Sequence, residues 1–94
     1  MVESEFLYAP DTKIAARIVD GQLVILRPGS DELLRFNAVA SFVWSQIEVK
    51  PKPLLSLVHA VVDEFEVDTK AARTDLMEFL KAMEEQHLIR RIQP

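Results

Sequence analysis

The chain contains no cysteine, and its 94 residues include only two glycines, Gly21 and Gly29. Without cysteine there is no disulfide, no thiolate metal site and no cysteine nucleophile. Two isolated glycines cannot form a glycine-rich loop of the kind that cradles phosphate groups. These absences exclude several common designs of active site.

Long apolar runs and clusters of positive charge are also missing. No apolar run approaches the ~20 residues that a membrane-spanning helix needs. The N-terminus carries Glu3 and Glu5 and lacks the basic and apolar regions of a secretion signal. We therefore expect a cytoplasmic protein with no membrane partner. The net charge of −4 gives no attraction to phosphate backbones, so we expect no nucleic-acid partner either.

Hydrophobic residues make up 49% of the chain and charged residues 28%, which is the composition of a globular protein. A chain of this length fits one domain with one modest core. We expect a flexible N-terminus over residues 1–12 and a single domain over residues 13–92.

The first half of the chain has the pattern of short β-strands. Apolar and β-branched residues mark strands at residues 14–20, 23–26 and 32–36. Asp20-Gly21 separates the first two strands and favours a two-residue hairpin turn. Because short turns can join only antiparallel neighbours, we expect a three-stranded antiparallel meander.

After Asn37 the apolar residues recur with the period of a helix. This spacing predicts helices over residues 38–47, 54–65 and 69–86, with Asn37 and Asp68 as N-caps. The expected fold class is therefore α+β, in which a winged-helix-like meander is followed by three helices.

One face of this sheet has no helix to cover it. Leu34 and Phe36 point to one side of the third strand, whereas Leu33 and Arg35 point to the other. Helices gathered on one side cannot cover both faces. We therefore expect something other than these helices to cover the second face.

Residues with catalytic chemistry are few and lie in no recognised arrangement. His59 is expected on a helix surface and His87 at a helix end, where a cation is favourable. Ser41, Ser45 and Ser56 are expected as helix-surface or first-turn hydroxyls, because no nucleophile motif surrounds them. We expect no catalytic residue, no metal and no cofactor.

A binding site is predicted where the third strand meets the third helix. Residues 32–36 form the last strand of the meander, and an edge strand can accept another chain as an additional strand. Met77 lies on a flank of the third helix near Arg73, Leu80 and Glu84. Its flexible thioether would suit a peptide groove, whereas the alternative is a lone exposed methionine.

Four segments, in this order and spacing, resemble a known family. They are LRFNAVASFVW (residues 34–44), FEVD (65–68), DLMEFL (75–80) and QHLI (86–89). Over about residues 16–92, the chain is similar to the PqqD-like proteins, also called RiPP recognition elements.

The resemblance implies a peptide chaperone. In this family the leader of a ribosomally made precursor peptide adds as a strand to the third strand and packs against the third helix. The chaperone presents it to a maturation enzyme, such as a radical-SAM protein, a protease or a cyclase, in pyrroloquinoline-quinone (PQQ) biosynthesis or in the pathway of another peptide. The residues that correspond in this chain are Glu32, Leu33, Leu34, Arg35, Phe36, Arg73, Met77, Leu80 and Glu84.

Two other functions remain open at this point: an oligomerisation domain, such as a homodimer that covers the bare sheet face, and a winged-helix DNA binder. The acidic residues of the third helix disfavour DNA. For a peptide chaperone, backbone pairing roughly cancels the cost of ordering the leader, so apolar contacts must supply affinity. We expect Leu33→Lys or Met77→Asp to weaken leader binding while leaving thermal stability nearly unchanged.

Overall fold

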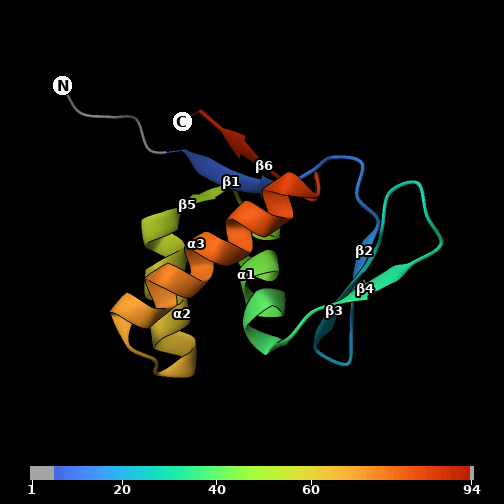
Figure 1. The fold of residues 1–94 in the computed structure, drawn as a ribbon. Helices are drawn as coiled ribbons and strands as arrows, with labels where there is room; N and C mark the ends of the chain where they lie inside the picture. The colour runs from blue at the N-terminus through green and yellow to red at the C-terminus, as the bar shows by residue number, and fades with distance from the viewer. Residues whose placement is uncertain (1–5, 94) are drawn as a thin grey trace.

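The first half of the chain folds into an antiparallel meander. The computed structural model describes residues 6–93. Strands β2 (Ala16–Val19), β3 (Gln22–Leu26) and β4 (Leu33–Arg35) follow one another in a sheet of order β2-β3-β4, seen on the right of Figure 1. The meander predicted from the sequence is confirmed.

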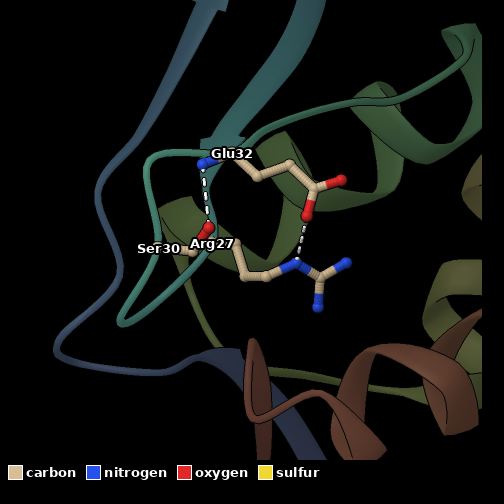
Figure 2. Close-up of polar contacts among 3 residues, drawn as sticks. All are labelled: Arg27, Ser30 and Glu32. Atoms are coloured by element: carbon tan, nitrogen blue, oxygen red, sulfur yellow. Dashed lines mark hydrogen bonds and ion pairs between the residues drawn. The ribbon is translucent and has the colours of Figure 1, made fainter.

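The two turns of the meander are held by local interactions. Asp20 and Gly21 have φ values of 52° and 80°, as a two-residue hairpin turn requires. In the β3–β4 turn the Arg27 Nε donates to the Glu32 carboxylate at 2.8 Å, and the Glu32 N–H donates to the Ser30 hydroxyl at 3.0 Å (Figure 2). The start of β4 is therefore tied to the end of β3.

Three helices follow, as the apolar period predicts. They are α1 (Ala38–Val49), α2 (Leu54–Phe65) and α3 (Thr69–Glu85). The Asn37 and Asp68 side chains each accept a hydrogen bond from the backbone N–H three residues later, at 2.9 and 3.1 Å. The predicted N-caps are thus confirmed. Within residues 6–93 no helix combines the length and apolarity needed to cross a membrane.

A second small sheet joins segments from three parts of the chain. Strand β1 (Leu7–Pro10) lies between β5 (Lys52–Pro53) and β6 (Ile89–Ile92) and is antiparallel to both. The flexible N-terminus expected over residues 1–12 is wrong for β1, which is a paired strand; residues 1–5 lie outside the described part of the chain.

The core lies between the meander, the three helices and the second sheet. Burial of Leu23 and Ile25 from β3 against Trp44 of α1 joins the first sheet to the helices. Besides Trp44, the fully buried side chains come from five elements and the residue before β6: Leu23, Ile25, Val43, Ile47, Leu57, Val58, Leu80, Met83, Leu88 and Ile89.

The outer face of the β2–β3–β4 sheet is bare in the described structure. The helices lie to one side of this sheet in Figure 1. Leu26 and Leu33 are 41% and 55% exposed on the other side, and Val24 between the outer strands is half-buried. The expectation that helices would leave one face uncovered is therefore confirmed for residues 6–93.

The Ser41 hydroxyl joins β3 to the start of α1. Ser41 is buried; its Oγ accepts the Leu23 N–H at 2.8 Å and donates to the Asn37 carbonyl at 2.7 Å. Ser41 is a first-turn hydroxyl of α1, as one of the two expectations had it, but it is buried and faces the sheet rather than the helix surface. It satisfies a buried backbone N–H that would otherwise have no acceptor.

We predict that Ser41→Ala lowers the free energy of unfolding by about 1–3 kcal/mol, because the buried Leu23 N–H loses its acceptor. Urea unfolding measured by circular dichroism would test this. The control is Ser45→Ala: the Ser45 hydroxyl donates only to the Phe42 carbonyl of its own helix, and its removal should cost about 0.5 kcal/mol or less. Equal losses in the two variants would contradict the role given to Ser41.

Candidate functional site: a free strand edge beside an apolar groove

The hydrogen bonds of β4 show which of its backbone groups are unpaired. The Arg27 N–H donates to the Glu32 carbonyl, and the Phe36 N–H donates to the Leu23 carbonyl. Hydrogen-bonded pairs alternate along an antiparallel ladder, so the backbone of Leu34, paired with Ile25, also faces β3. The backbone groups of Leu33 and Arg35 must then face the opposite edge.

That edge therefore offers two N–H and two C=O groups. In the described residues β4 is the last strand of its sheet and pairs only with β3. The side chains of Leu33 and Arg35 lie on the exposed outer face, whereas Leu34 is half-buried and packs against the core. An unpaired edge of this kind can accept another strand.

An aromatic contact shows which side of α3 lies towards β4. The rings of Phe36, which follows β4, and Phe79 of α3 meet edge to face, with centroids 6.4 Å apart and an interplanar angle of 82°. This is a favourable geometry for an aromatic pair. The flank of α3 that carries Phe79 is thus the flank near the strand.

A groove of about 530 Å³ opens on this same flank. Side chains of α1, the end of α2 and the first half of α3 line it, and most of them are apolar: Val39, Ala40, Val43, Val61, Val67, Ala71, Ala72, Leu76 and Phe79. Its polar lining residues are Asn37, Asp75 and Glu78. The volume is typical of a pocket that binds a small ligand or a side chain.

Three of the four helix residues expected in the site lie on a different flank of α3 from Phe79. At 3.6 residues per turn, Arg73, Met77 and Glu84 are about 120° to 160° around α3 from Phe79. The Glu84 carboxylate forms an ion pair with Arg91 of β6. Burial raises the pKa of the Tyr8 hydroxyl in β1, and the nearby Glu84 raises this pKa further. Glu84 thus lies beside the second sheet, whereas Arg73 and Met77 are exposed on α3.

Leu80, the fourth expected helix residue, is 1% exposed and belongs to the core. Of the strand residues, Leu33 and Arg35 are exposed at the free edge, and Leu34 and Phe36 are half-buried beneath it. The carboxylate of Glu32 is paired with Arg27 and stabilises the turn. Of the five strand residues, Phe36 contacts Phe79, which lines the groove. Arg73, Met77 and Glu84 do not line it.

The groove residues Ala71, Asp75, Glu78 and Phe79 were not predicted as site residues. None of these four residues has an individual signal in the sequence that marks it as a site residue. A helical wheel identifies two flanks beside the buried stripe, but it does not tell which flank lies next to the strand. The Phe36–Phe79 contact supplies that information only once the fold is known.

The open strand edge and the apolar groove have the features of a small binding domain. Comparison with known proteins shows the family to which the chain belongs. The family described as coenzyme PQQ synthesis protein D (PqqD) matches residues 22–89, and the chain belongs to this family. A solved structure, "TbiB1 in Complex with the TbiA(beta) Leader Peptide", is similar with a TM-score of 0.77 and 26% sequence identity, over 86% of this chain and 93% of that chain. A search of curated proteins found no match.

The free edge predicts a specific pattern of amide hydrogen exchange. The N–H groups of Leu34 and Phe36 donate to β3 and should exchange slowly, whereas those of Leu33 and Arg35 face solvent. We expect the second pair to exchange at least about tenfold faster, measured residue by residue by NMR. Equal protection of all four amides at micromolar concentration would show that the edge of β4 is already covered.

Proposed function

We propose that this chain binds the leader segment of a ribosomally made precursor peptide and holds it for a separate maturation enzyme. The chain itself performs no chemistry in this proposal. The observation that carries it is the unpaired edge of β4 beside the groove. Membership of the PqqD family and the similarity to TbiB1, which was solved with a leader peptide, support the same function.

In the first step the leader pairs with the backbone of β4. The N–H and C=O groups of Leu33 and Arg35 allow up to four hydrogen bonds, worth ~0.5–1.5 kcal/mol net each. Ordering a flexible peptide costs ~2–5 kcal/mol. Strand addition alone therefore gives little affinity, although it aligns the peptide.

In the second step the leader places apolar side chains in the groove. A micromolar complex needs about −8 kcal/mol, and each fully buried apolar side chain contributes ~1.5–3 kcal/mol. Two or three such side chains would therefore supply most of the required affinity. The groove is large enough and its lining, from Val39 of α1 to Phe79 of α3, is mostly apolar.

The proposed site accordingly differs from the one predicted from sequence. It keeps the strand residues around Leu33 and Arg35 and takes its helix residues from the flank of Ala71 and Phe79. Met77 is 51% exposed on the other flank, so Met77→Asp should no longer affect leader binding. Leu33→Lys remains a substitution that we expect to weaken it.

An oligomerisation domain is the competing function, because a second copy could pair with the same edge or cover the bare sheet face. Sedimentation at low micromolar concentration separates the two functions. A constitutive dimer would stay dimeric on dilution, whereas a free peptide site would be monomeric and would titrate with peptide. Affinity for random duplex DNA that falls steeply with salt would instead indicate a nucleic-acid binder.

The central prediction concerns the groove. Peptides selected on the wild-type chain from a displayed library of random 16-residue sequences are the probe. Ala71→Trp should fill the groove and weaken a selected peptide by about 10- to 100-fold, the contribution of one buried apolar side chain. Isothermal titration calorimetry gives the affinity, and thermal unfolding should show little change because Ala71 is exposed.

Met77→Trp is the matched control, since it adds a similar side chain to the opposite flank of α3. Its affinity should equal that of the wild type. Bound peptide should also slow the exchange of the Leu33 and Arg35 amides, which face the free edge. Protection at β6 instead, or equal losses in both tryptophan variants, would exclude the site proposed here.

A further inference from the structure

The outer face of the first sheet carries two arginines, Arg17 and Arg35, that have no role in the proposed function so far described. The register pairs Val24 of β3 with Arg17 of β2 on one side and with Arg35 of β4 on the other. Residues directly opposite one another in a sheet project to the same face. The two arginines therefore flank Val24 on the face that the helices leave bare.

Neither arginine is neutralised by the part of the chain that the structure describes. The ion pairs found within residues 6–93 join Arg27 to Glu32 and Arg91 to Glu84, and they involve neither Arg17 nor Arg35. Both side chains are exposed. This face is thus locally positive although the chain as a whole carries a net charge of −4.

An apolar row lies beside the charged one. Leu26 of β3 is paired with Leu33 of β4, and both side chains are exposed on the same outer face. Along β4, the outer face therefore presents Leu33 and then Arg35, two residues apart. A strand added at the free edge would meet these two side chains directly.

The geometry of strand addition fixes which peptide residues they meet. Because the backbone groups of Leu33 and Arg35 face the edge, the residues of the added strand that pair with them project to the outer face. The residue between those two projects inward, towards α3. There Asp75 and Glu78 line the groove, and no basic side chain does.

We infer that this site selects leader peptides with an acidic residue and an apolar residue two positions apart, the acid beside Arg35 and the apolar residue beside Leu33. This inference rests on the proposed function. An acid turned inward would meet Asp75 and Glu78, whereas an acid turned outward meets Arg35. The signs of charge on the two sides of the added strand thus allow only one placement of the acid.

The test is a comparison of selections from the displayed 16-residue library on the wild-type chain and on Arg35→Glu. The wild type should enrich Asp or Glu two positions from an apolar residue, and Arg35→Glu should enrich Lys or Arg at that position. A Glu→Lys change in a wild-type-selected peptide should weaken binding about 3- to 10-fold on the wild type and restore it on Arg35→Glu. The difference should shrink at 0.5 M salt.

Arg73→Glu is the matched control, because it makes the same change of charge on the far flank of α3. It should enrich the same peptides as the wild type. Should Arg35→Glu fold poorly, Arg35→Gln is used, and it should lose the acidic preference. An unchanged acidic preference in either variant, with the Leu33 and Arg35 amides still protected by peptide, would overturn this inference alone. Peptides that leave those amides unprotected would overturn the proposed function as well.

Discussion

The free edge depends on one buried hydroxyl, that of Ser41. In a continued ladder the Leu23 N–H would donate to the residue opposite it, Phe36. Here the Ser41 hydroxyl accepts a hydrogen bond from that N–H and donates one to the Asn37 carbonyl, while the Asn37 side chain caps α1. The chain can therefore leave the sheet directly after β4 and begin a helix within three residues. This short exit brings Phe36 onto Phe79 and sets the strand edge beside the groove.

The second sheet fixes the opposite side of α3. Strand β6 follows α3 closely, and the Arg91–Glu84 ion pair joins the two. Exposed ion pairs contribute little stability, so the ordering of this region comes mainly from Leu88 and Ile89, which are buried. One flank of α3 is thus used for architecture and the other, with Ala71 and Phe79, is left open. Small side chains such as Ala71 keep the groove from being filled by the helix itself.

The sequence predicted those parts of the fold that depend on local chemistry. Asn37, Asp68 and the Asp20-Gly21 turn have the residue types that their backbone positions require, and each was located correctly. The role of Ser41 was not predictable, because its acceptor function depends on an N–H that is 18 residues away. Strand β1 was missed for the same reason: it is short, and both of its partners are distant in sequence. Of the site residues expected from the sequence, Leu33 and Arg35 lie at the free edge, whereas Arg73, Met77 and Glu84 do not line the groove.

The backbone edge of β4 and the side chains around it contribute differently to the selection of a peptide. Backbone pairing at β4 is independent of the peptide sequence, and its net contribution is comparable to the cost of ordering the peptide. Discrimination must then come from side chains on the two faces of the added strand. The inner face meets an apolar groove with acidic lining residues, and the outer face meets Leu33 and Arg35. Since an added strand alternates its side chains between the two faces, a two-residue period of polarity in the peptide is the pattern that both surfaces can recognise at once.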